Sequence, residues 1–364
     1  VAPVTRPLDQ PLHTAAMAVA LLLAPPLTAC YTPPGLLEGL VAQKRREVER
    51  LRRMPEARED GSWALRLGYP TSDTSFALTR AIGWKRERPA VLADLKRMSP
   101  GAKLGQTDVV CEVLDAAIAI DDAIDANLAG ALVAIDRTSY GGSAEDLIAA
   151  RRRADEAARK GLPTLPLVAK DLVIDPLQVA RAASLGADAV LLVAGACVDD
   201  FSLLLDTCTL LGVEALVEVH TPEEVELAGR ARRGAPFLFQ RVSFLQVELA
   251  AECGAGLFLV TERDRATGRV QRGQARRMAP LLPPDAISLA TGGVASIDQV
   301  RELHAAGYDG VVLGRSYPGA SGRRLVEEVR AEEPRLRLVE PITVREPGDP
   351  LEPLVEEEAE AGGG

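Results

Sequence analysis

The stretch Ala90-Val-Leu-Ala-Asp-Leu-Lys-Arg-Met-Ser-Pro-Gly101 is the segment around which the rest of this chain is organised. Its apolar beginning predicts a buried strand, and Pro100-Gly101 predicts a turn directly after it. Side-chain alternation along a strand places Asp94 and Lys96 on the same face. An acid and a base at the carboxyl end of a buried strand are typical of the active-site rim of a (β/α)8 barrel, although a solvated strand end could contain the same residues.

Apolar segments that predict strands recur through most of the chain. They are centred near residues 92, 133, 167, 190, 217, 258, 288 and 312, and helical spacing follows most of them. Eight strand–helix units over roughly 250 residues are the number found in an α/β protein of the (β/α)8, or TIM barrel, class. A doubly wound parallel sheet is the alternative, but no G-x-G-x-x-G motif follows the first strand.

Segments with helical spacing lie between the predicted strands. They are 108–120, 144–158, 176–185, 199–211, 296–306 and 322–330. Thr221-Pro-Glu-Glu224 has the pattern of a capping box and predicts the start of another helix. Two alternatives remain for the sixth strand, 237–240 and 256–261, because both are short apolar runs. A candidate helix, 245–253, lies between them.

The two ends of the chain fall outside this pattern, so we expect a disordered leader over 1–35, a barrel over 36–330 and a disordered acidic tail over 331–364. The leader contains an apolar run, 14–30, that is broken by two prolines. This run is too short for a membrane span but typical of a targeting segment. It predicts a plastid or another organelle as the location, with the cytoplasm as the alternative. A membrane or assembly contact, if there is one, is expected through this run.

Residues 36–54 predict an amphipathic helix in front of the barrel. Its apolar stripe is formed by Leu36, Leu37, Leu40, Val48 and Leu51. The basic run 44–46 in the same segment is interpreted as a solvated face.

Composition excludes several classes of function. The net charge of −10 argues against a nucleic-acid partner. The five cysteines form no C-x-x-C pair and no Cys/His cluster, which argues against a structural metal site and a disulfide framework. Aromatic residues are only 4% of the chain, so Leu, Val and Ala must fill the core.

Ionisable residues follow four of the predicted strands. They are Asp94 and Lys96, Lys170 with Asp171, Glu218 with His220, and Arg263 with Asp264. Two lysines facing a glutamate in a cleft form a set for proton transfer, because a partly dry lysine near another cation becomes a usable acid at neutral pH. A buried layer of ion pairs is the structural alternative. Position at the carboxyl ends of the strands favours the catalytic interpretation.

Glycines and hydroxyls follow the last two strands. Thr291-Gly-Gly293 and Gly314-Arg-Ser316 lie where barrels of this class bind phosphate with backbone N–H groups and a helix N-terminus. Arg315 would add positive charge. The residues alone therefore predict a barrel that acts on a small phosphorylated substrate by acid–base catalysis.

Six segments resemble one family of barrel enzymes, the indole-3-glycerol phosphate synthases. They are DLKRMSPG (94–101), YGGS (140–143), LVAKDLVIDPLQV (167–179), GADAVLLVA (186–194), LVEVHTPEE (216–224) and GYDGVVLGRS (307–316). The helix expected at 36–54 is similar to that family's extra N-terminal helix. The resemblance covers about residues 36–330 in unbroken order.

The resemblance implies a lyase of tryptophan biosynthesis. Such enzymes close the indole ring of 1-(2-carboxyphenylamino)-1-deoxyribulose 5-phosphate with loss of CO2 and water, and they use no metal or organic cofactor. It implies that Lys170 is the general acid, Glu218 the general base and Lys96 the second catalytic lysine, with Asp94 at a catalytic position beside them. The substrate- or phosphate-binding positions that it implies are Ser99, Thr261, Arg263, Thr291, Gly292, Gly314, Arg315 and Ser316.

Several positions depart from the family pattern. Asp94 replaces a Glu, and Leu172 replaces an aromatic residue on the anthranilate side. Thr261-Glu262-Arg263 replaces Asn-Asn-Arg, although a different alignment would place Gln240-Arg241 there. Ala290-Thr291-Gly292 replaces Glu-Ser-Gly, so we expect Ala290 to remove an active-site carboxylate. The departures leave two alternatives to an active synthase: a non-catalytic paralogue that acts as a binding or assembly subunit, and a related phosphate-binding barrel with a different reaction.

Overall fold

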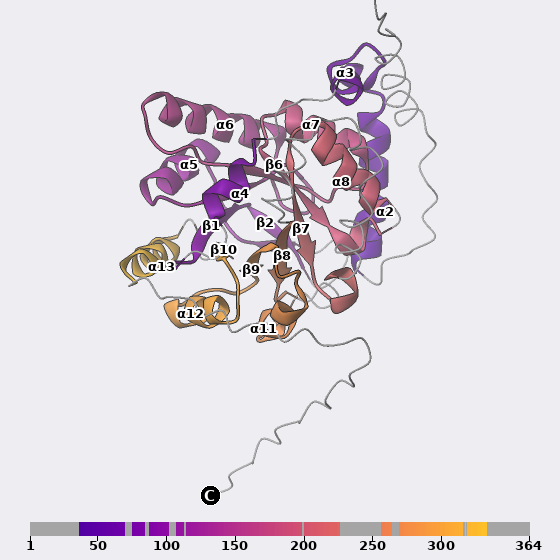
Figure 1. Cartoon of the computed structure of the whole chain (residues 1–364). Coiled ribbons are helices and arrows are strands. Elements are labelled where there is room, and N and C mark those ends of the chain that lie inside the picture. Colours follow the sequence, from indigo (N-terminus) through magenta and orange to yellow (C-terminus); the bar gives the residue numbers. More distant parts are fainter. Residues whose placement is uncertain are drawn as a thin grey trace, which may run out of the picture.

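A closed barrel of eight parallel strands forms the centre of the molecule (Figure 1). The computed structural model describes residues 36–69, 75–83, 87–101, 107–112, 114–198, 200–225, 256–263, 269–315, 317 and 319–332. The barrel strands, in chain order and in spatial order, are β1 (Ala90–Leu95), β4 (Gly130–Ala134), β5 (Leu167–Lys170), β6 (Ala189–Val193), β7 (Glu214–Val219), β8 (Leu257–Thr261), β9 (Ile287–Thr291) and β10 (Gly310–Leu313). β10 pairs with β1 and closes the barrel. The predicted TIM barrel and its eight strands are confirmed.

Helices surround the barrel (Figure 1). They are α2 (Leu36–Leu51), α3 (Ser62–Gly68), α4 (Ala77–Ile82), α5 (Ala116–Asp125), α6 (Ala144–Arg159), α7 (Pro176–Ser184), α8 (Phe201–Leu210), α11 (Gln274–Met278), α12 (Ile297–Ala305) and α13 (Ala320–Ala331), with short 3-10 turns at Pro55–Ala57, Ala194–Ala196 and Ala279–Leu281. Side-chain caps define several starts: Ser143 accepts from Asp146 N, Asp175 from Leu177 N and Ser296 from Gln299 N.

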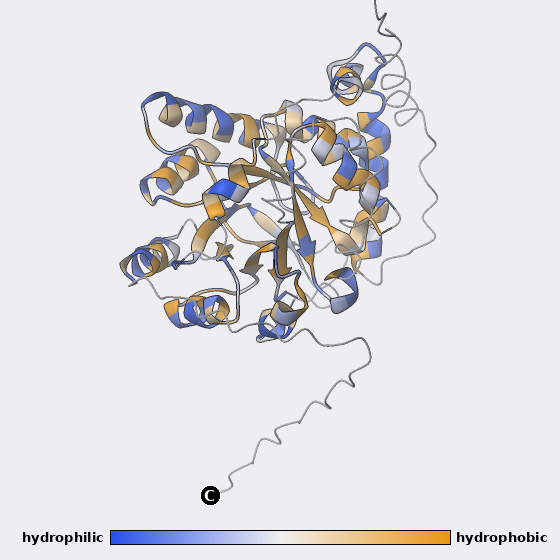
Figure 2. Cartoon of the chain, in the orientation of Figure 1, coloured by the Kyte–Doolittle hydropathy of each residue, from blue (hydrophilic) through white to orange (hydrophobic). Residues whose placement is uncertain are grey.

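Alternation along the strands divides the core into two layers. Residues such as Leu92, Leu132 and Leu289 belong to a cluster inside the barrel, whereas Val133 and Phe258 pack between the strands and the helices. Figure 2 shows the strands as predominantly apolar and the helices as a mixture of apolar and polar residues. Both faces of the sheet are therefore buried, as the run of apolar residues in each strand predicts.

The N-terminal end of the barrel is closed by α4. Its Leu78 and Ile82 join the cluster inside the barrel, and both are fully buried. Glu214, the first residue of β7, accepts hydrogen bonds from Leu78 N at 2.7 Å and Thr79 N at 3.1 Å. A cavity that admits a substrate can therefore open only at the other end, where the strands finish.

The prediction of a helix over 108–120 is wrong for the first half of that segment. Residues Thr107–Val109 form strand β3, which pairs antiparallel with β2 (Met98–Pro100) in a hairpin after β1. The helix α5 starts only at Ala116, because Asp115 accepts from Ala117 N at 2.9 Å and Ile118 N at 3.2 Å and so caps the helix there.

The basic run in α2 is not wholly solvated. Arg45 and Arg46 are exposed, as expected, but Lys44 is 3% exposed and forms ion pairs with acidic residues at the ends of two barrel strands. The prediction of a solvated face was therefore wrong for Lys44. It lies on the same stripe of α2 as Val41 and Val48, which are buried as well.

The structure also decides between the two candidates for the sixth strand. Residues Leu257–Thr261 form β8 between β7 and β9, while 237–240 lies outside the described residues. The predicted leader, the candidate helix 245–253, Gln240-Arg241 and nearly all of the acidic tail also lie outside them. The helix start predicted at Thr221 is confirmed, since Glu224 N donates to Thr221 Oγ1 at 3.3 Å and so caps the helix there. Among the described helices, none is long and apolar enough to cross a membrane.

Candidate active site

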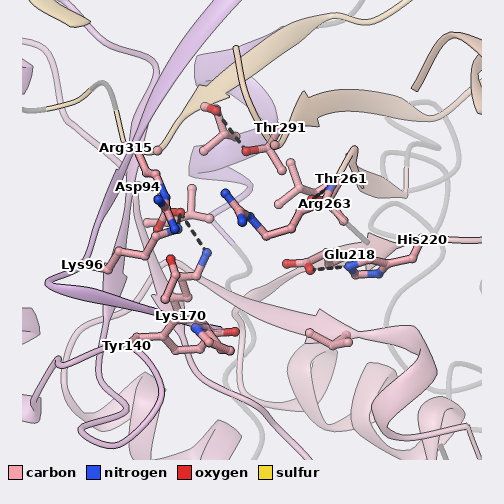
Figure 3. Close-up of a pocket in the computed structure, with 18 of the residues that line it drawn as sticks. Asp94, Lys96, Tyr140, Lys170, Glu218, His220, Thr261, Arg263, Thr291 and Arg315 are labelled. Atoms are coloured by element: carbon pink, nitrogen blue, oxygen red, sulfur yellow. Dashed lines mark hydrogen bonds and ion pairs between the residues drawn. The ribbon is translucent and has the colours of Figure 1, made fainter. Parts of the chain in front are cut away.

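One cavity lies at the carboxyl ends of the barrel strands and collects the residues that the sequence singled out (Figure 3). Predicted site residues that line it are Asp94, Lys96, Ser99, Lys170, Glu218, Thr261, Arg263, Thr291, Gly292, Gly314 and Arg315. Ser316 and Asp264 lie outside the described residues. Residues from β1, β5, β7, β8 and β9 meet here because parallel strands present their carboxyl ends at one rim.

Two lysines share one carboxylate oxygen on one side of the cavity. Lys170 Nζ donates to Asp94 Oδ2 at 3.0 Å, and Lys96 Nζ donates to the same oxygen. Asp94 is 3% exposed and Lys170 is 6% exposed. Asp94 and Lys96 reach the same interior because they are two residues apart on β1 and its end, as alternation predicts.

The three groups differ in how readily they exchange a proton. Burial would raise the pKa of Asp94, but the positive charges of Lys170 and Lys96 hold it below its usual value. Burial would lower the pKa of Lys170, but Asp94, Tyr140 and Glu218 together outweigh this effect and the pKa is raised. Burial lowers the pKa of Lys96 to about 8, because the attraction of Asp94 is partly cancelled by repulsion from Lys170. Lys96 is thus the lysine of the pair that can both lose and regain a proton near neutral pH.

A fourth ionisable group, Glu218 of β7, faces the two lysines from across the cavity. Its negative charge raises the pKa of both Lys96 and Lys170. Its Oε1 lies 3.2 Å from His220 Nε2, as the dashed line in Figure 3 shows. The cavity therefore contains two cationic groups and a separate carboxylate that could act as acid and base in the same reaction.

An apolar wall forms another side of the cavity. It contains Leu36, Leu37 and Leu40 from α2, together with Leu172. Leu37 and Leu172 belong to one small buried cluster. The spacing of apolar residues predicted that α2 is amphipathic, but nothing in it indicated which part of the barrel the helix covers.

Tyr140 also lines the cavity, although it is not among the site residues predicted from the sequence. The Lys170 ammonium lies 5.2 Å from the centroid of the Tyr140 ring. Tyr140 follows β4 and is the first residue of the YGGS segment (140–143). The resemblance of that segment to the family was the sequence feature that could have identified Tyr140 as a site residue. An aromatic face beside the ammonium allows a favourable cation–π contact and narrows the cavity next to Lys170.

The side of the cavity beyond β8, β9 and β10 carries positive charge and glycine-rich backbone. Burial, together with the positive charge of the nearby Arg315, lowers the pKa of Arg263. Arg315 is held by an exposed ion pair with Asp108 of β3 at 2.7 Å. Gly292 has a φ of +100°, and a Cβ there would lie 2.7 Å from Glu262 N. The backbone at this rim is thus packed too closely for any larger residue, and two guanidinium groups stand beside it.

Ala290 does not lie where the family comparison by sequence placed it. Its side chain is fully buried in the layer between barrel and helices, and the neighbouring Thr291 lines the cavity instead. Successive residues of a strand point to opposite faces, so an alignment that is one residue out exchanges an inward position for an outward one. The carboxylate that the family has on this strand is still absent, and Thr291 is the residue facing the cavity. Its hydroxyl donates to Val312 O at 3.0 Å.

Asp171 likewise points away from the cavity. Its Oδ1 lies 2.7 Å from Lys44 Nζ of α2, which also pairs with Asp136 Oδ2 and with Glu47 Oε2 at 2.6 Å. Lys170 and Asp171 are adjacent and therefore alternate, one toward the substrate space and the other toward the helix. Within the described part of the chain, no group of three or more His, Cys, Asp or Glu side chains is placed to hold a metal ion.

Comparison with known proteins gives one consistent result. The family model described as indole-3-glycerol phosphate synthase matches residues 37–238. The chain is 30% identical over 287 residues to the indole-3-glycerol phosphate synthase of Roseiflexus sp. strain RS-1, covering 77% of this chain and 92% of the relative. It is 29% identical over 255 residues to that of Koribacter versatilis strain Ellin345, covering 68% and 84%. The match thus extends over most of both proteins.

Proposed function

This chain belongs to the indole-3-glycerol phosphate synthase family, and from that membership we propose that it is a catalytically active carboxy-lyase of tryptophan biosynthesis. The reaction closes the indole ring of 1-(2-carboxyphenylamino)-1-deoxyribulose 5-phosphate and releases CO2 and water. The observation that carries the proposal is the grouping of Lys96 and Lys170 on Asp94, with Glu218 facing them in one cavity.

The arrangement supports a division of the substrate among three parts of the cavity. The apolar wall of Leu36, Leu37, Leu40 and Leu172 suits the phenyl ring. Arg263 and Arg315, with the backbone at Gly292, suit the phosphate, since guanidinium groups pair well with phosphate oxygens. The ribulose carbons then lie between these ends, where the lysines and Glu218 stand.

The chemistry follows from the protons that must move. When the ring carbon attacks the ribulose carbonyl, the carbonyl oxygen becomes a hydroxyl, and Lys170 donates that proton. Loss of CO2 then restores the aromatic ring without further help from an acid. The new hydroxyl must leave as water, which requires a second proton donor, the role of Lys96. Glu218 takes up the proton that is released as the indole double bond forms.

Formation of product by the purified full-length chain tests this proposal directly. We expect indole fluorescence to appear when the chain is incubated with the carboxyphenylamino-deoxyribulose phosphate. Glu218→Gln, which keeps the size of the side chain but removes the base, is expected to lower kcat by about 10²- to 10⁴-fold. Absence of product together with intact binding of a substrate analogue would instead favour the non-catalytic paralogue.

The pH dependence of kcat/KM, which reports the pKa values of the free enzyme, gives a second test, because Lys96 acts as a proton donor only while protonated. With a pKa of about 8, it carries its proton below that pH and loses it above. We therefore expect kcat/KM to fall as the pH rises through about 8. In Lys96→Arg, whose guanidinium stays protonated, this basic limb is expected to vanish from the residual activity. A basic limb that is unchanged in Lys96→Arg would assign it to another group.

A further inference from the structure

We infer that His220 and Glu224 are positioning residues that hold the carboxylate of Glu218 in place, as a carboxylate–imidazole–carboxylate chain. The inference rests on the proposed function, in which Glu218 is the base. His220 Nε2 lies 3.2 Å from Glu218 Oε1, and His220 Nδ1 lies 3.5 Å from Glu224 Oε2. The imidazole therefore has a carboxylate oxygen on each side.

The backbone around β7 fixes the two carboxylates on either side of the His220 ring. Glu218 and His220 are two residues apart at the end of β7 (Glu214–Val219), so their side chains extend on the same side. His220 N donates to Glu224 Oε2 at 2.6 Å, and Glu224 N donates to Thr221 Oγ1 at 3.3 Å. The start of the helix after β7 thus holds Glu224 against the ring.

Gly195 keeps the space that Glu224 occupies. It belongs to the short turn Ala194–Ala196 after β6, and a Cβ at this position would lie only 2.2 Å from Glu224 Oε1. Any larger residue at Gly195 would push the Glu224 carboxylate away. The series of side-chain contacts therefore extends from the turn after β6 through Glu224 and His220 to the Glu218 carboxylate in the cavity.

The chemistry explains why a base would be held in this way. A carboxylate can rotate about its last bond, and only one orientation directs a free lone pair at the substrate. A hydrogen bond from His220 Nε2–H to one oxygen leaves the other oxygen for catalysis. Among the described residues, Lys96 and Lys170 face Glu218, Arg263 lines the same cavity, and Glu224 faces His220 from the next helix.

Spectroscopy can test the contacts independently of activity. The chain has only three histidines, so ¹⁵N-histidine labelling of the full-length protein gives few signals, and His220→Gln identifies those of His220. We expect the Nε2 signal to move in Glu218→Gln and the Nδ1 signal to move in Glu224→Gln. If neither signal moves, the inference is overturned, whether or not the chain has synthase activity.

Kinetics test whether the contacts matter for the reaction. His220→Leu is expected to lower kcat roughly 10- to 100-fold with little change in KM, and to move the acidic limb of the kcat profile to higher pH. His220→Gln, whose amide can still donate to Glu218, is expected to recover most of kcat. Gly195→Ala is expected to change kcat and the acidic limb in the same way as Glu224→Gln, because both substitutions disturb the Glu224 carboxylate.

The matched control is His304→Leu. His304 lies on α12 and its Nδ1 contacts Tyr308 O at 3.0 Å, outside the cavity. We expect kcat and its pH profile to stay as in the wild type. A loss of kcat in His220→Leu with an unmoved acidic limb and no recovery in His220→Gln would show a structural role only and would overturn the inference.

Discussion

Replacing Lys170 by methionine is expected to lower kcat/KM by at least about 10³-fold, because it removes the acid that protonates the substrate carbonyl. The ammonium of Lys170 is buried, lies 3.0 Å from Asp94 Oδ2 and faces Glu218. No other cation is held on both Asp94 and the Tyr140 ring among the described residues. A loss of that size corresponds to about 4 kcal/mol of transition-state stabilisation.

The same substitution is expected to leave the fold intact. Asp94 keeps Lys96 as a partner on the same oxygen, so no buried carboxylate is left without a cation. Methionine fills most of the volume of the lysine stem beside Tyr140. Thermal unfolding within a few degrees of the wild type, with loss of product in the fluorescence assay, is the expected combination.

Lys170→Arg, the control that retains the charge, is expected to remain strongly impaired because guanidinium is a much weaker acid. Activity within tenfold of the wild type in Lys170→Met would exclude Lys170 as the essential acid.

The barrel could be predicted from the sequence because each strand is buried on both faces. Leu92 points inward and Ala93 outward, yet both must be apolar, so the strands appear as apolar runs that are interrupted only near their ends, by residues such as Asp94 and Glu218. The charged rim could be predicted for a similar reason. Asp94 and Lys170 stand where such runs end, and parallel strands bring these ends together.

What could not be predicted depends on tertiary contacts. The pattern around residue 108 fits a helix, but pairing with Met98–Pro100 makes Thr107–Val109 a strand. The inward position on β9 could not be fixed from the sequence, since an alignment one residue out exchanges Ala290 for Thr291. Lys44 looked like one of three surface cations, because its acidic partners are far away in sequence and only the closed barrel brings them to it.

Replacing Lys44 by methionine is expected to lower the free energy of unfolding by about 3–5 kcal/mol, because it leaves buried carboxylates without their cation. Lys44 is 3% exposed and pairs with Asp136, Asp171 and Glu47. Burial would raise the pKa of Asp136, but Lys44 holds it below its usual value, whereas burial raises the pKa of Asp171 despite Lys44. Removal of Lys44 therefore leaves both aspartates buried without the cation that they share.

Denaturant unfolding measures this effect, with Arg45→Met as the matched control, since Arg45 is an exposed neighbour on the same helix. The control is expected to stay within about 0.5 kcal/mol of the wild type. Adding Asp136→Asn to Lys44→Met is expected to recover part of the loss by removing one unpaired charge. Equal effects of Lys44→Met and Arg45→Met would show that the cluster does not stabilise the fold.

Lys44→Met is also expected to weaken substrate binding, because of where Lys44 lies on α2. Leu40 and Leu37, one and two helical turns before Lys44, belong to the apolar wall of the cavity. Lys44 ties that helix to Asp136 and Asp171, just after β4 and β5. Arg52, which pairs with Asp175 at 2.6 Å just beyond the end of α2, still anchors the far end when Lys44 is lost. We therefore expect α2 to loosen near its N-terminal half, so that KM rises more than kcat falls. A rise in KM that Asp136→Asn partly reverses would show that one buried ion cluster supports both the fold and the wall against which the substrate ring packs.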